Sequence, residues 1–319
     1  MHFSDRLRNE PRLDGDASVA CDIIGHVKIR PWLQFFRLPN LPTAPGDALA
    51  GAAVLMCFSG GNLAQAVASG AAALFLYMFG LADNDIVGAS ADGPERPLAR
   101  GDVSMRAART VRALCLAGAG IVGTCARLPP AWWGAALALA GAVLAYNRTK
   151  GKWLMGLCRG LSVVCGAFAV WRPACDWRAI GALACLAGGW TLYIAAVTKL
   201  SEGEERDSEG LGCRRFVWGV SAFVPLGVCA FMPDLRALLL PAVGSFFAFL
   251  AWCAAVVPLG AAHASNDRRR AVGQAIGALL YLQVGYMLVT PCREFLVLAI
   301  LLWVAARLAR RLAPEISGS

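Results

Sequence analysis

The chain has 319 residues, of which 58% are hydrophobic and only 16% are charged, and its mean hydropathy is +0.56. Soluble domains carry about a quarter charged residues, so this composition excludes an ordinary soluble protein and predicts a polytopic membrane protein. The net charge of +9 would favour a nucleic-acid partner in a soluble domain. In a membrane protein the surplus of Lys and Arg indicates orientation instead, and we expect a lipid bilayer and no nucleic acid as partner.

Apolar runs of about 20 residues predict helices that cross a bilayer, because only a hydrogen-bonded helix satisfies its own backbone in lipid. The chain contains ten such runs, and the last two could also form one span with an amphipathic segment. We therefore expect an all-α bundle of nine to ten transmembrane helices. The runs cover 40–59, 64–83, 105–126, 131–147, 153–172, 178–199, 214–232, 236–258, 271–289 and 294–312.

The distribution of basic residues predicts the orientation of this bundle. Short cytoplasmic loops collect Lys and Arg, and with the amino terminus inside, 25 of the 30 fall on the cytoplasmic side. No apolar signal-peptide region precedes residue 28. We expect a multi-pass protein of the inner (cytoplasmic) membrane, with a cytoplasmic amino-terminal segment at 1–30, a transmembrane domain at 31–313 and a tail at 314–319.

An acidic cluster follows the second predicted span and contains Asp83, Asn84, Asp85 and Asp92. On a continuous helix Asp85 and Asp92 would lie about 20° apart around the axis and roughly 10 Å apart along it, so they would share a face. Carboxylates on one face suit Mg²⁺, which prefers carboxylate and phosphate oxygens. Asp83 taken alone is more typical of a solvated helix end.

A second acidic cluster follows the sixth span, with five carboxylates between Glu202 and Glu209. It is either a solvated loop or the second half of a metal–diphosphate site on the cytoplasmic face. In the second case, the basic side chains between the clusters would bind the phosphates. These are Arg96, Arg100, Lys150, Lys152 and Arg159. Asp47 lies seven residues into an apolar span and is either a site residue or a hydrogen-bond partner in helix packing.

Several of these motifs resemble the UbiA superfamily of intramembrane prenyltransferases. Asn84-Asp85, Asp92 and the run 96–101 (RPLARG) are similar to its first aspartate-rich motif and the loop that follows. Further matches, at 37–43, 146–147, 155–160 and 193–205, extend the resemblance over about residues 30–290, and spans one and five look closest to the EboC-like branch. Gly88 departs from the family pattern, because an aspartate is typical there, and the second motif has glutamates in place of aspartates.

The resemblance implies transfer of an isoprenoid group from an allylic diphosphate donor to a small acceptor. It implies Mg²⁺ held by Asp85, Asp92, Glu202 and Glu205, with Tyr193 and Lys199 joining the two aspartates as catalytic residues. The implied substrate-binding residues are Asn40, Asn84, Arg96, Arg100, Tyr146, Lys150, Lys152 and Arg159. Aromatic residues that could line the isoprenoid tunnel are Phe75, Tyr77, Phe79, Phe168 and Trp190, together with Tyr193.

Two other functions stay open at this point. The protein could be a membrane carrier or binding protein for a lipid-linked small molecule, with no bond cleavage. It could also be an impaired family member that acts as a scaffold in a membrane biosynthetic complex, and Gly88 is the residue that favours this alternative. The sequence identifies neither the acceptor nor the chain length of the donor, because both depend on the shape of the pocket.

Overall fold

The computed structural model describes residues 29–94, 96–172, 176–202, 219–220, 224, 228, 231, 268–289 and 294–317. All regular structure in these residues is helical. A short helix α2 and a 3-10 turn η1 precede eight long helices. The elements are α2 (Ile29–Phe35), η1 (Leu38–Asn40), α3 (Thr43–Ser59), α4 (Leu63–Gly88), α5 (Met105–Cys125), α6 (Pro130–Thr149), α7 (Lys152–Ala169), α8 (Trp177–Glu202), α11 (Arg268–Val289) and α12 (Glu294–Ser317).

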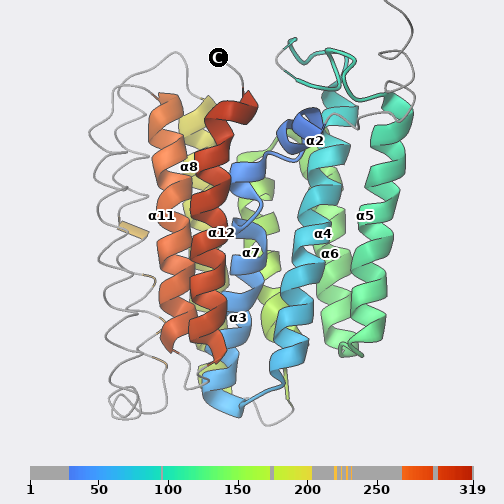
Figure 1. Ribbon diagram of the computed structural model, residues 1–319. Helices are drawn as coiled ribbons and strands as arrows, with labels where there is room; N and C mark the ends of the chain where they lie inside the picture. Colours follow the sequence, from blue (N-terminus) through green and yellow to red (C-terminus); the bar gives the residue numbers. More distant parts are fainter. Residues whose placement is uncertain are drawn as a thin grey trace, which may run out of the picture.

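The long helices run up and down beside one another (Figure 1). Helices α4, α6, α8 and α12 end at the upper side of the figure, where α3, α5, α7 and α11 begin. The basic runs 96–112, 148–152 and 268–270 lie at these helix ends. We call this side of the bundle the basic end, and the alternation of the helices explains why the basic residues collect there.

The described helices agree with eight of the ten predicted spans, and their ends differ from the prediction by at most five residues. Helices Leu63–Gly88, Lys152–Ala169 and Trp177–Ser201, and the segment Leu38–Ser59, are long and apolar enough to cross a membrane. The spans predicted at 214–232 and 236–258 lie outside the described residues, apart from five isolated helical positions. Helix α12 continues to Ser317, through most of the segment expected to be a tail.

Helix α7 lies at the centre of the bundle and contacts α3, α6 and α8. Glycines make these close contacts possible, as is common where membrane helices approach each other. A Cβ at Gly166 would overlap the backbone carbonyl of Ala48 on α3, and one at Gly156 would overlap that of Thr191 on α8. The backbone contacts hold α3 and α8 close to α7, and these three helices supply Asp47, Arg159 and Trp190 of the buried polar network described below.

Candidate functional site

A cavity opens near the basic end between α3, α4, α6 and α7, and its empty volume, including its open mouth, is about 650 Å³. Its walls are largely apolar, with Leu76, Leu139 and Val143 among them. Its polar lining consists of Arg37, Asp47, Tyr77, Asn84, Tyr146, Asn147, Cys158, Arg159 and Ser162. Of the aromatic residues expected in a tunnel, Tyr77 lines this cavity and Phe75, Phe79, Phe168, Trp190 and Tyr193 do not.

Asp85 lies beside the mouth of the cavity and is 1% exposed. Its Oδ1 accepts hydrogen bonds from Arg37 Nη2 at 3.4 Å and from Asn84 Nδ2 at 3.2 Å, and Arg96 Nη1 lies 4.0 Å away. Its Oδ2 is buried and has no hydrogen-bond partner among the described residues. A buried carboxylate oxygen without a partner is costly, so this oxygen is suited to a ligand that carries positive charge.

Asp92 reaches the same region by a different route from the one the sequence predicted. Helix α4 ends at Gly88, and a tight turn follows in which the amides of Ala91 and Asp92 both donate to the Gly88 carbonyl. Asp85 and Asp92 therefore do not lie on one continuous helix, and the shared face expected for such a helix does not apply. The turn brings Asp92 back over Gly88, where a Cβ would lie 2.9 Å from Asp92 Oδ2.

Lys150 completes the charged mouth from the junction between α6 and α7. It ends α6 in the left-handed conformation, with φ of 54°. Its Nζ donates to Asn84 Oδ1 and lies 5.6 Å from the centre of the Tyr146 ring. Desolvation lowers the pKa of Lys150 below its ordinary value, while the negative charge of Asp92 acts in the opposite direction. The ammonium group thus bonds to Asn84 and interacts electrostatically with Asp85 and Asp92. From this position at the mouth it can also bind an anion.

Two acid–base contacts near the mouth pair Asp83 with Arg112 and Arg100 with Asp102. Asp83 is buried and accepts hydrogen bonds from Arg112 at 2.8 Å and from Asn147 at 2.9 Å, so the interpretation of it as a solvated helix end is wrong. Arg100 donates to Asp102 at 2.6 Å and to Gln34 at 3.0 Å. The Arg100 bonds anchor the loop after α4, whereas the Asp83 bonds tie α4 to α5 and α6.

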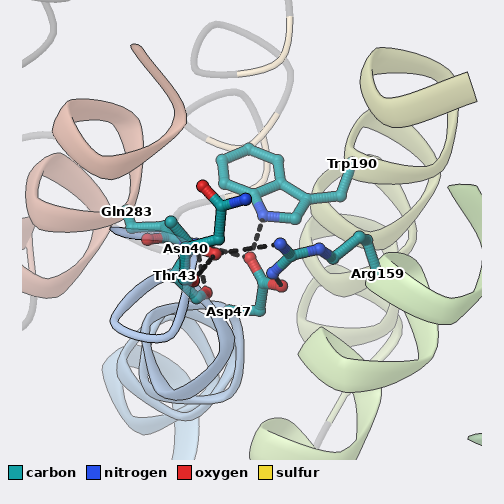
Figure 2. A network of polar contacts seen from close by, with 6 residues as sticks. All are labelled: Asn40, Thr43, Asp47, Arg159, Trp190 and Gln283. Carbon is teal, nitrogen blue, oxygen red and sulfur yellow. Dashed lines mark hydrogen bonds and ion pairs between the residues drawn. The ribbon is translucent and has the colours of Figure 1, made fainter. Parts of the chain in front are cut away.

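A second polar network lies in the wall of the cavity (Figure 2). Asp47 is fully buried and accepts hydrogen bonds from Arg159 at 2.7 Å, from Trp190 at 2.7 Å and from Gln283 at 2.5 Å. Arg159 also donates to Thr43 Oγ1 at 2.9 Å. The network joins α3, α7, α8 and α11. The sequence singled out Asp47 as a charged residue inside an apolar span, whereas Gln283 was missed, although it too is a polar residue inside an apolar span.

The remaining predicted residues are not part of the cavity lining, or they lie outside the described residues. Tyr193 is buried against α11, where its hydroxyl donates to the Ala275 carbonyl at 2.7 Å. Lys199 is half-buried in the last turn of α8, and Lys152 begins α7. Asn40 ends η1, and its carbonyl accepts from Thr43 Oγ1. Glu202 ends α8, but its side chain, like all of Glu205, lies outside the described residues.

The structure therefore describes the side chains of only two of the four predicted metal ligands, Asp85 and Asp92. Within the described ranges, no three His, Cys, Asp or Glu residues come close enough to hold a metal ion together. Asp85 and Asp92 are the two carboxylates at the mouth, and both act electrostatically on Lys150. Mg²⁺ commonly takes one or two carboxylates and completes its shell with water and phosphate oxygens, so the donor atoms of this pair are of the type that suits such an ion.

No protein-family model and no curated protein matches the chain. Solved structures do. A membrane digeranylgeranylglyceryl phosphate synthase matches with a TM-score of 0.51 and 14% identity, over 81% of this chain and 97% of that protein. A UbiA homologue from Archaeoglobus fulgidus matches in two states. With GPP and Mg²⁺ the TM-score is 0.48 at 14% identity, over 88% and 99% of the two chains. With DMAPP and Mg²⁺ the TM-score is 0.45 at 16% identity, over 87% and 98%.

At 14% identity the match to the synthase establishes the fold, and it covers nearly the whole of that protein. The apolar helices agree with this match, because four segments are long enough to cross a bilayer. The chain is a multi-pass integral membrane protein with the all-α fold that its resemblance to the UbiA superfamily implied.

Proposed function

We propose that the protein is a membrane prenyltransferase that transfers an isoprenoid group from an allylic diphosphate to a small acceptor. One observation supports this most strongly. A largely apolar cavity opens beside a buried aspartate, Asp85, whose Oδ2 lacks a partner among the described residues. Arg37, Arg96 and Lys150 surround that aspartate. An apolar tail with a charged diphosphate head matches this division of the site.

Asp85 and Asp92 are the residues that would hold Mg²⁺ at the mouth. When bound there, the ion would offset the negative charge that develops on the diphosphate as the carbon–oxygen bond breaks. Glu202 ends α8 at the same basic end of the bundle, and we propose it, together with Glu205 three positions later in the sequence, as the second acidic pair. In this arrangement the basic end of the bundle faces the cytoplasm, where its many Lys and Arg residues favour it.

The side chains of the mouth would bind and orient the donor. Arg37, Arg96 and Lys150 can donate charge-assisted hydrogen bonds to the diphosphate, and Asn84 positions the Lys150 ammonium group. The apolar walls formed by Leu76, Leu139 and Val143 would hold the isoprenoid tail and exclude water from the reacting carbon. Exclusion of water matters because water would otherwise capture the allylic cation.

Binding of a labelled donor tests this function directly. We expect the purified protein in nanodiscs to bind radiolabelled geranyl diphosphate in the presence of Mg²⁺ and to lose most of this binding in EDTA. We also expect diphosphate release when a panel of phenolic and alcoholic acceptors is added. Donor binding with no release under any metal condition would contradict the transferase and favour the carrier or scaffold alternative.

Replacement of Lys150 by Gln should weaken donor binding about tenfold, because a charge-assisted hydrogen bond to the diphosphate is lost. Arg148 provides a matched control, since it is exposed near the same end of α6 and donates to the Leu144 carbonyl at 3.0 Å. We expect Arg148→Gln to bind the donor like the wild type. Equal donor affinities in all three proteins, measured by equilibrium dialysis with Mg²⁺, would show that Lys150 does not bind the donor.

A further inference from the structure

The inner part of the cavity holds a charged group that lies far from the mouth. The Arg159 guanidinium is centred 5.2 Å from the middle of the Tyr77 ring, and both side chains line the cavity. Tyr77 precedes Asn84 on α4 by seven residues, which places it about 10 Å deeper. That separation is several times a hydrogen-bond length of about 3 Å. Arg159 is thus a candidate to bind a different part of the substrates from the phosphates, to which the sequence assigned it.

Arg159 offers hydrogen-bond donors to whatever occupies this inner part. A guanidinium group carries five N–H donors. Bonds to Asp47 at 2.7 Å and to Thr43 Oγ1 at 2.9 Å use two of them among the described residues. The side chain is 12% exposed although it lies inside the bundle, and the surface it exposes belongs to the cavity lining. The arginine can thus donate to a ligand without breaking either bond.

Asp47 determines which kind of ligand this site accepts. Its carboxylate is fully buried, and the hydrogen bonds from Arg159, Trp190 and Gln283 fix its position (Figure 2). The Arg159–Asp47 pair has no net charge. A carboxylate or phosphate placed beside this pair would be buried without a counter-charge, which is strongly unfavourable. An uncharged oxygen can accept an arginine hydrogen bond without that cost.

We propose that Arg159, balanced by Asp47, binds the acceptor at the inner end of the cavity and selects one with an uncharged oxygen, such as a quinone, phenol or alcohol. Acceptors that present a carboxylate or phosphate at this position are disfavoured. The proposal rests on the proposed function, because it assigns the acceptor end of the same cavity. It is tested by binding alone, so activity is not needed as a readout.

The probes are 4-hydroxybenzamide and 4-hydroxybenzoate, which share a ring and a phenol but differ in the charge of one group. Equilibrium dialysis at pH 7 with the full chain in nanodiscs should show the amide binding at least about tenfold more tightly. Arg159→Gln should weaken amide binding about tenfold. Arg112→Gln removes an ion pair with Asp83 outside the cavity lining and should leave amide binding unchanged.

Asp47→Asn provides the sharpest test, because it leaves the charge of Arg159 without a counter-charge. The preference should then move toward 4-hydroxybenzoate by at least about tenfold relative to the wild type. If this variant does not fold, probe binding by the wild type and by Arg159→Gln still tests the proposal. Equal affinity of the wild type for both probes, no binding of either probe, or unchanged amide binding in Arg159→Gln would each overturn the proposal. Unchanged binding in that variant is the result expected of a purely structural ion pair.

Geranyl diphosphate binding with Mg²⁺, measured on the same samples, separates this proposal from the function it rests on. Selective amide binding without donor binding would contradict the proposed transferase function and support the proposed inner site. Donor binding without amide selectivity would contradict the inner site and support the transferase function.

Discussion

Asp85→Asn should lower the rate of Mg²⁺-dependent diphosphate release by about 10²- to 10³-fold, the loss typical when a group that stabilises developing charge is removed. The amide has nearly the same shape as the carboxylate but carries no charge. It therefore removes the buried oxygen that has no partner among the described residues, and with it the counter-charge for Arg37 and Arg96. Initial rates with geranyl diphosphate in nanodiscs measure the effect.

Asp83→Asn is the matched control, because Asp83 is equally buried and lies only two residues away on α4. Its bonds to Arg112 and Asn147 tie α4 to α5 and α6, so we expect a lower melting temperature with a rate near that of the wild type. If Asp85→Asn releases diphosphate at a rate near that of the wild type, Asp85 does not take part in the reaction. Equal losses in both variants would show a general effect of the substitutions on this end of α4.

Gly166→Leu should prevent formation of the native bundle. Even the first side-chain carbon at this position would overlap the Ala48 carbonyl, and a backbone cannot move aside as a flexible side chain can. Overpacking in a well-packed core costs about 1–3 kcal/mol, and here α3 and α7 would also have to separate. We expect size-exclusion chromatography in detergent to show less than about a tenth of the monodisperse wild-type peak.

Gly141→Leu is the control for this substitution, since a Cβ at Gly141 on the exposed side of α6 meets nothing within 4 Å. The same added volume should leave the elution profile and the melting temperature close to those of the wild type. A monodisperse Gly166→Leu protein that binds geranyl diphosphate would show that α3 and α7 are not as tightly constrained as the structure indicates.

The sequence was sufficient to predict the fold, because each long apolar run must form a helix in lipid, whatever its neighbours are. The sequence also placed Asp85 and Lys150 at the ends of predicted spans, and in the structure they lie near the ends of α4 and α6. Partners distant in the sequence could not be predicted. Asp47 meets Arg159, Trp190 and Gln283 from three other helices, and no local pattern specifies such crossings. The same limit applies to Tyr193, whose hydroxyl bond to Ala275 depends on how α8 packs against α11.

The turn after α4 links the identity of residue 88 to the position of Asp92. A side chain at Gly88 would displace the Asp92 carboxylate, which lies over that position. That contact is with the end of a flexible side chain, so an aspartate at residue 88 would shift the Asp92 carboxylate rather than exclude it. Gly88 thus allows the Asp92 carboxylate to lie directly over the end of α4.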